Sequence, residues 1–282
     1  MELYLAGGRE DERLEHEVRL LFERLQKIGA APCDVVVVDM PQQHCGLGSK
    51  TSVLLSTAVA IADFSNLQLE PAQLIALSGR GGTSGIGINT FFLGGVIADS
   101  GHSEPKHSRN FAPSSRRMGP ASLPKVVARV EVPDNMRVLL FIDTFSSKIR
   151  IQGNEEMRIF AETMPLKEIE NLRSLAAVYH GVIPALQEGD MNMLFQSIRD
   201  LNSCGMKQIE VNLQSNITQT FIRDVWSNSI PCGVSSFGPI VFCIVNANSD
   251  AITVAMRLAH VHNLTCMGLF AFDNTGAISE RS

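Results

Sequence analysis

Two neighbouring segments indicate the fold, Asp34-Val-Val-Val-Val-Asp39 and Gly46-Leu-Gly-Ser-Lys-Thr51. The second segment leads into an apolar run that ends at about Phe64. The β-branched run predicts a strand and the apolar run predicts a helix, with a glycine turn between them. The amino end of a helix carries unpaired N–H groups and the positive end of its dipole, which suits a phosphate. Lys50 would add a charge, although the Gly-Lys pair of a P-loop is absent. The alternative is a plain glycine turn in which Ser49 caps the helix.

Two more glycine-rich turns follow, Gly79-Arg-Gly-Gly-Thr-Ser-Gly-Ile-Gly87 and Gly233-Val-Ser-Ser-Phe-Gly-Pro239. Glycine costs conformational entropy, so a cluster of glycines indicates positive φ angles or the close approach of a ligand. The forked guanidinium of Arg80 can bind a carboxylate or a phosphate. The alternatives are a flexible surface turn for the first and a plain β-turn for the second. We expect the three turns to line one anion-binding cavity.

The rest of the chain alternates helices and strands without an internal repeat. A polar segment from Ser100 to Leu123 reads as a long loop. We expect two α+β domains, residues 1–134 with most of the glycine turns and residues 135–282. The predicted helices cover 10–28, 71–78, 154–163, 166–180, 190–203, 216–228 and 250–262, and the remaining predicted strands cover 136–142, 239–246 and 266–272.

Composition excludes several classes of protein. The 282 residues are 45% hydrophobic and carry a formal net charge of −5, so non-specific binding to nucleic acid is not expected. The six cysteines include no Cys-x-x-Cys pair, which indicates buried thiols in a reducing cytoplasm rather than a structural zinc site. There is no signal peptide pattern and no apolar stretch long enough to cross a bilayer. We expect a cytoplasmic protein that binds neither nucleic acid nor a membrane.

Taken in order, the three turns resemble the GHMP kinase superfamily, which is named for galactokinase, homoserine kinase, mevalonate kinase and phosphomevalonate kinase. Pro41-x(4)-Gly-Leu-Gly-Ser49 looks like its phosphate-binding motif, and Gly233–Pro239 looks like its third, glycine-rich motif. The resemblance implies an α+β fold with an N-terminal domain like ribosomal protein S5 and a ferredoxin-like C-terminal domain.

Within the superfamily the chain is most similar to the β-ribofuranosylaminobenzene 5′-phosphate synthase branch. The specific piece is the Gly-Arg-Gly-x-x-Ser-Gly-Ile-Gly block at 79–87. GHMP kinases with a catalytic aspartate often carry it in a Ser-Gly-x-Asp context. Here Gly87 follows Ile86, so that carboxylate is absent, which argues against kinase activity without excluding it. The other similar segments are His44–Ser49, Gly94–His102, Arg137–Ile142, Pro184–Asp190 and Ser235–Pro239.

The resemblance implies a decarboxylating phosphoribosyl transfer in methanopterin biosynthesis. 4-Aminobenzoate and phosphoribosyl pyrophosphate would give β-ribofuranosylaminobenzene 5′-phosphate, carbon dioxide and pyrophosphate. This chemistry requires stabilisation of the departing pyrophosphate and an aromatic ring held against C1 of the sugar. Mg²⁺ would share the pyrophosphate charge, and we expect a homodimer.

Roles for individual residues follow from the same resemblance. The expected catalytic residues are Arg80, which would pair with a substrate anion, Asp99, which would ligate Mg²⁺ or steady the sugar cation, and His44. Asp99 has the alternative of capping a turn, and His102 the alternative of a solvated loop position. The residues expected to bind phosphate or substrate are Gly46, Gly48, Ser49, Lys50, Thr51, Ser84, Gly85, Gly87, His102, Ser235, Ser236 and Gly238.

The start of the sequence departs from the resemblance. Members of the synthase branch normally begin with a further strand segment, whereas here the residues after Met1 read as the second strand. We therefore expect a first domain that lacks its first strand segment, with an open sheet edge or a partner to complete it. Two alternatives to the synthase remain: an ATP-dependent small-molecule kinase, and a shortened relative that binds a phosphorylated ligand without turnover.

Overall fold

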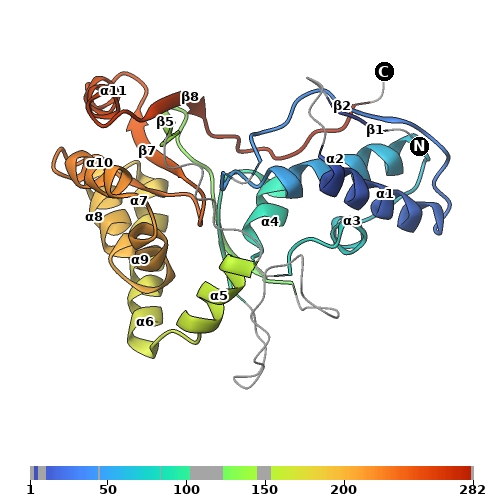
Figure 1. The fold of residues 1–282 in the computed structure, drawn as a ribbon, viewed down its shortest axis with the longest axis horizontal. Helices are drawn as coiled ribbons and strands as arrows, with labels where there is room; N and C mark the ends of the chain where they lie inside the picture. The colour runs from blue at the N-terminus through green and yellow to red at the C-terminus, as the bar shows by residue number, and fades with distance from the viewer. Residues whose placement is uncertain are drawn as a thin grey trace. The chain divides into compact units, whose positions relative to one another are not determined.

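The computed structural model describes residues 3–5, 11–43, 45–82, 84–101, 123–144 and 154–280. It divides into two compact units (Figure 1). The first comprises Met1–Gln43, Gly48–Val127 and Thr275–Ser282, and the second comprises His44–Leu47 and Ala128–Asn274. The division expected from the sequence was a single one, after residue 134. In the structure the chain divides after residue 127, and two short segments join the other unit. Residues His44–Leu47 join the second unit, where Cys45 packs with Ile142 and Ile240. Residues Thr275–Ser282 join the first unit, where the N–H of Ala277 donates to the Phe91 carbonyl at 2.7 Å.

Helices α1 (Glu12–Gln26) and α2 (Ser49–Phe64) form the core of the first unit. The carboxylate of Asp11 accepts from the N–H groups of Arg13 and Leu14 and so caps α1. Apolar residues at helical spacing bury one face of α1 against α2. The buried side chains are Leu14, Val18, Leu21 and Leu25 from α1 and Val53, Leu54, Ala58 and Ile61 from α2.

Shorter elements complete the first unit. Helix α3 (Pro71–Ser78) starts with proline at its first position, inside a capping box made by Glu70 and Gln73. Helix α4 (Ile86–Leu93) follows Gly85 directly. Strand β1 (Leu3–Leu5) pairs in parallel with β2 (Val35–Val37), and β3 (Val96–Asp99) pairs with β4 (Val126–Val130).

The second unit is built on a four-stranded antiparallel sheet in the order β6 (Cys232–Val234), β7 (Ile240–Asn246), β5 (Met136–Ile142), β8 (Thr265–Ala271). Helices α10 (Asn216–Trp226) and α11 (Ala251–Val261) share a buried core with these strands (Figure 1). In this core Phe141 packs edge-on against Phe221, with 5.3 Å between the ring centroids. Alternate residues of β5 and β7 therefore bury one face of the sheet.

Five further helices belong to the second unit: α5 (Asn154–Thr163), α6 (Glu168–Ala177), α7 (Ile183–Glu188), α8 (Met191–Asn202) and α9 (Gly205–Asn212). The helix expected over 166–180 ends at Ala177 and continues as a π-turn, Val178–Val182, into α7. Pro184 explains this widening, because its ring would clash with the carbonyl four residues earlier in a regular α-helix. Within the described residues, every helix is too short or too polar to cross a bilayer.

Candidate functional site

The amino end of α2 carries the first glycine turn. Gly48 is the N-cap residue, with φ +68°, and a Cβ placed there would meet no atom within 4 Å. Glycine is needed here for its backbone angle, and the space beside it is open. Ser49 is buried, and its hydroxyl donates to the Gln42 carbonyl at 2.8 Å. Ser49 thus fixes the loop to the start of the helix.

The first turn packs against the third turn within the second unit. A Cβ on Gly46 would overlap the backbone carbonyl of Ser235, and a Cβ on Gly238 would overlap the carbonyl of Cys45. The Ser235 hydroxyl also donates to the Gly46 carbonyl at 2.7 Å. Both glycines are required because two backbones lie in direct contact. Ser236 is exposed and has a left-handed backbone, with φ +56°.

The second turn contacts α2 within the first unit. Arg80 donates from Nε to Thr51 Oγ1 at 3.1 Å. A Cβ on Gly87 would lie 3.4 Å from Thr51 Cγ2, so α4 approaches α2 closely at this point. The structure thereby brings Arg80, Thr51 and Gly87 together at the amino end of α2. Within the second unit Cys45 and Gly46 contact the third turn, and within the first unit Thr51 contacts the second turn.

Asp99 holds the second turn in shape. Its Oδ2 accepts from the Gly85 N–H at 2.9 Å, and its Oδ1 accepts from the Gly101 N–H at 2.9 Å. A Cβ on Gly85 would lie 2.8 Å from the same Asp99 Oδ2, so only glycine fits. Ser84 is exposed, and its hydroxyl accepts from the Ile86 N–H at 3.2 Å at the start of α4. Both side chains therefore organise the backbone from 84 to 101.

Lys50 forms an ion pair with Glu17 of α1. Burial lowers the pKa of Lys50, the hydrogen bond and negative charge of Glu17 raise it, and the positive charges of Arg80 and Arg13 lower it. The amino end of α2 is therefore surrounded by three cationic side chains and one carboxylate. That environment favours an anion.

Two of the predicted site residues, His44 and His102, lie outside the described residues. The part of the chain that the structure describes holds no group of three His, Cys, Asp or Glu side chains placed to bind a metal ion. Asp99, the predicted Mg²⁺ ligand, already gives one lone pair of each carboxylate oxygen to a backbone N–H. Each Asp99 oxygen keeps a second lone pair, so this carboxylate can still contribute to an Mg²⁺ ion that is held mainly by substrate phosphates.

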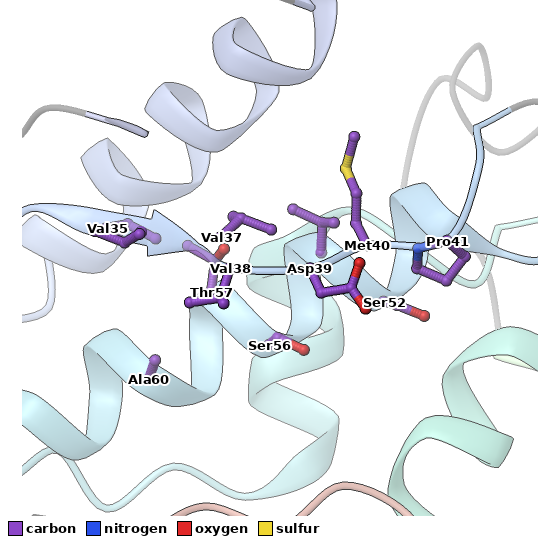
Figure 2. Close-up of a pocket in the computed structure, with 12 residues that line it drawn as sticks. Val35, Val37, Val38, Asp39, Met40, Pro41, Ser52, Ser56, Thr57 and Ala60 are labelled. Atoms are coloured by element: carbon purple, nitrogen blue, oxygen red, sulfur yellow. The ribbon is translucent and has the colours of Figure 1, made fainter. Parts of the chain in front are cut away.

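A groove of about 290 Å³ runs beside α2 in the first unit. Figure 2 shows the extended segment Val35–Pro41 on one side of it and α2 on the other. Five of the twelve lining residues are valines, and the Asp39 carboxylate is the charged group of the wall. The α2 residues that line the groove are Ser52, Val53, Ser56, Thr57 and Ala60. On α2 the groove-lining residue nearest the amino end is Ser52, the residue after Thr51.

Sequence reasoning missed this groove. The signal was present in the four consecutive valines, because a strand exposes alternate side chains on one face. Val36 and Val38 are 63% and 78% exposed. Nothing in the valine run itself showed which helix it would lie beside.

Comparison with known proteins finds relatives of this chain in sequence and in fold. Residues 16–95 match the model of the GHMP kinases N terminal domain. The chain is 35% identical over 216 residues to a protein of Methanothermobacter thermautotrophicus named beta-ribofuranosylphenol 5'-phosphate synthase, covering 76% of this chain and 64% of that one. It is 30% identical over 226 residues to a protein of the same name from Archaeoglobus fulgidus, covering 79% of this chain and 68% of that one. The aligned region thus spans about two thirds of these relatives.

Two solved structures share the fold at low sequence identity. Homoserine kinase from Cytophaga hutchinsonii superposes with a TM-score of 0.65 at 13% identity, covering 98% of this chain and 82% of that chain. Phosphomevalonate kinase from Streptococcus pneumoniae superposes with a TM-score of 0.67 at 11% identity, covering 95% of this chain and 86% of that chain. At these identities the likeness concerns the fold.

Proposed function

This chain belongs to the family of the beta-ribofuranosylphenol 5'-phosphate synthases, within the GHMP kinase superfamily, and we propose that it catalyses a decarboxylating phosphoribosyl transfer. The donor is phosphoribosyl pyrophosphate. The acceptor is a benzoate with a para substituent, either 4-aminobenzoate or its 4-hydroxy counterpart, and the second is favoured by the phenol in the relatives' name. The products are the ribofuranosyl arene 5′-phosphate, carbon dioxide and pyrophosphate, as a step toward methanopterin.

The observation that carries this proposal is the 35% identity over 216 residues, because the likeness to kinases concerns only the fold. The second turn adds a physical argument against the kinase alternative. Gly87 occupies the position at which many kinases carry an aspartate, and it lies against Thr51 of α2. The chain therefore lacks, beside Thr51 and Arg80, the carboxylate that would orient or deprotonate a hydroxyl acceptor.

In the proposed reaction the chain binds and orients, and needs no covalent nucleophile. The bond from ribose C1 to pyrophosphate breaks, and the electron pair leaves on pyrophosphate. The ring carbon that bears the carboxylate bonds to C1, and the electron pair of its bond to carbon dioxide restores the aromatic ring. We assign the pyrophosphate to the amino end of α2, where backbone N–H groups, Arg80 and Lys50 would stabilise the growing negative charge.

The groove beside α2 supports a place for the acceptor. Its valines offer an apolar surface to an aromatic ring, and Asp39, Ser52 and Ser56 offer hydrogen-bond partners for a polar substituent. Its volume of about 290 Å³ is at the small end of ligand pockets, which run from roughly 300 to 1,000 Å³. A single substituted ring suits that size.

Magnesium remains part of the proposal as an ion brought by the donor. Mg²⁺ commonly binds through substrate phosphates and few protein carboxylates. Initial rates measured against Mg²⁺ at fixed donor concentration test this, since the rate should follow the concentration of the magnesium–donor complex and not that of free Mg²⁺.

The decisive experiment offers the purified chain each substrate set. With phosphoribosyl pyrophosphate and carboxyl-labelled 4-hydroxybenzoate or 4-aminobenzoate, we expect labelled carbon dioxide and one equivalent of pyrophosphate. Transfer of label from γ-labelled ATP to a hydroxylated acceptor, with no carbon dioxide, would instead establish the kinase alternative, since homoserine kinase shares this fold. Pyrophosphate binding without either reaction would identify a non-catalytic relative.

A further inference from the structure

One carboxylate, Glu17 of α1, pairs with a cation at the amino end of α2. Lys50 is in the first turn of α2, and its ammonium pairs with Glu17. Arg80 reaches the next residue, Thr51, through its Nε at 3.1 Å. Arg13 precedes Glu17 by one helical turn, so both side chains lie on the same side of α1. The arrangement holds three positive charges beside the helix end that the proposed function assigns to pyrophosphate.

The pair is half-buried, which gives it more weight than a surface ion pair. The side chains of Lys50 and Glu17 keep 25% and 26% of their exposure. Charges that are partly shielded from solvent are screened less by salt. Burial lowers the pKa of Lys50, and Glu17 opposes this shift with a hydrogen bond and its charge. Without Glu17, Arg80 and Arg13 would repel the Lys50 ammonium with no compensating partner.

We infer that Glu17 is a positioning residue, which holds the Lys50 ammonium beside the amino end of α2 so that an entering pyrophosphate meets a fixed cation. The identity of that anion rests on the proposed function. The inference predicts that loss of the Glu17 charge weakens anion binding, whereas simple charge repulsion predicts that it strengthens binding. A carboxylate near an anion site repels anions, so its neutralisation should strengthen binding unless the carboxylate positions a cation.

The test measures inorganic pyrophosphate binding by titration calorimetry, on the whole chain at fixed salt. We expect Glu17→Gln to weaken binding about tenfold, equivalent to about 1.4 kcal/mol. Glu23→Gln is the matched control, because Glu23 is an exposed glutamate on the same helix; this variant should bind within about twofold of wild type. Glu17→Asp should recover part of the loss. Unchanged or tighter binding by Glu17→Gln overturns the inference.

The pH dependence supplies a readout that a purely structural role would not move. The protonated Lys50 attracts the anion, so affinity falls as pH rises through the Lys50 pKa. Glu17 raises that pKa, and in Glu17→Gln the fall should therefore begin at a lower pH than in wild type. Among the described residues, the other charged groups that act on Lys50 are Arg13 and Arg80; helices α3 and α4 carry no charged residue. Coincident pH curves for wild type and Glu17→Gln contradict the inference.

Failure of the inference and failure of the proposed function give different results. A wild-type chain that binds pyrophosphate but forms no product refutes the transferase proposal and leaves the role of Glu17 open to the same comparison of variants. A wild-type chain that binds no pyrophosphate overturns the inference itself. Melting temperatures of Glu17→Gln and Glu17→Asp, measured beside the titrations, show that the compared proteins are folded.

Discussion

Two glycines of the first turn look alike in the sequence, but glycine is needed at each position for a different reason. Gly46 and Gly48 both have positive φ, +89° and +68°. A side chain at Gly48 would point into open space, whereas one at Gly46 would overlap the backbone of Ser235. The first glycine is needed for contact between two turns, and the second for its own backbone angle.

Replacement of each glycine by alanine should separate these two requirements. Gly48→Ala should lower the free energy of unfolding only by the cost of a left-handed alanine, on the order of 1–2 kcal/mol. Gly46→Ala should lose more than Gly48→Ala, because the turns must also move apart to relieve the overlap. Chemical denaturation of both variants measures the difference. Equal losses would show that Ser235 does not contact Gly46 in solution.

Asp99 offers a second test at the level of one residue. Hydrogen bonds from backbone N–H groups to a charged acceptor contribute roughly 1.5–3 kcal/mol each. Asp99→Asn keeps one acceptor oxygen and turns an NH₂ group toward the other N–H, so we expect a loss of about that size in the stability of the first unit. Denaturation with and without Mg²⁺ checks it. A loss seen only when Mg²⁺ is present would restore Asp99 as a metal ligand.

At the scale of elements, the groove makes the acceptor proposal specific. Ser56 is exposed on α2 and lines the groove. Ser56→Phe would fill the groove, so we expect the KM for the acceptor to rise about tenfold, or about 1.4 kcal/mol of lost binding, while the KM for the donor stays within twofold. Steady-state kinetics with each substrate varied in turn provides the measurement.

The control for this variant adds the same ring at a site away from the groove. Ala72 is exposed on α3, and Ala72→Phe should leave both KM values unchanged. Equal effects of Ser56→Phe on both substrates would place the acceptor elsewhere, and an effect on the donor alone would assign the groove to the donor.

Elements whose ends carry local signals were predictable from sequence. Helix α3 runs from Pro71 to Ser78 as predicted, because proline starts it and Gly79 ends it in a left-handed conformation. Strand β5 was likewise predicted with its observed ends, Met136 and Ile142. Helix α9 was missed, because it begins at Gly205, which has φ +55° and donates its N–H to Glu170 Oε2 from a distant helix. No local pattern contains that partner.

The candidate site divides in the same way. Residue types alone predicted that glycines and Arg80 would lie near α2. Glycine lets the backbone approach an anion closely, and arginine binds an anion through its guanidinium. The partners were not predictable in this way. Lys50 was expected beside phosphate from its position alone, but its pairing with Glu17, 33 residues earlier in the chain, was not foreseen. Asp99 was expected as a metal ligand or a turn cap, and its bond from the N–H of Gly85 was not foreseen. Such pairings depend on tertiary packing, which one sequence does not display.

At the scale of the whole molecule, the chain crosses between its two units more than once, and its last residues serve both. Asn274 bonds to the backbone of Val132 in the second unit, with Oδ1 accepting at 2.9 Å and Nδ2 donating at 3.0 Å. Three residues later, the Ala277 N–H donates to the Phe91 carbonyl in the first unit. Gly276 lies so close to the backbone of Phe92 that a Cβ would approach it to 2.7 Å.

Two variants should therefore loosen different units. Asn274→Ala removes both bonds to Val132, at roughly 0.5–1.5 kcal/mol each, and should speed amide hydrogen exchange in the second unit near that residue. A variant that ends at Asn274 keeps those bonds but removes the anchor on α4, so faster exchange should appear at α4 in the first unit. Exchange measured by mass spectrometry separates the two, because each unit reports its own local opening. If either variant loosened both units equally, residues 274–277 would belong to one cooperative unit rather than to two.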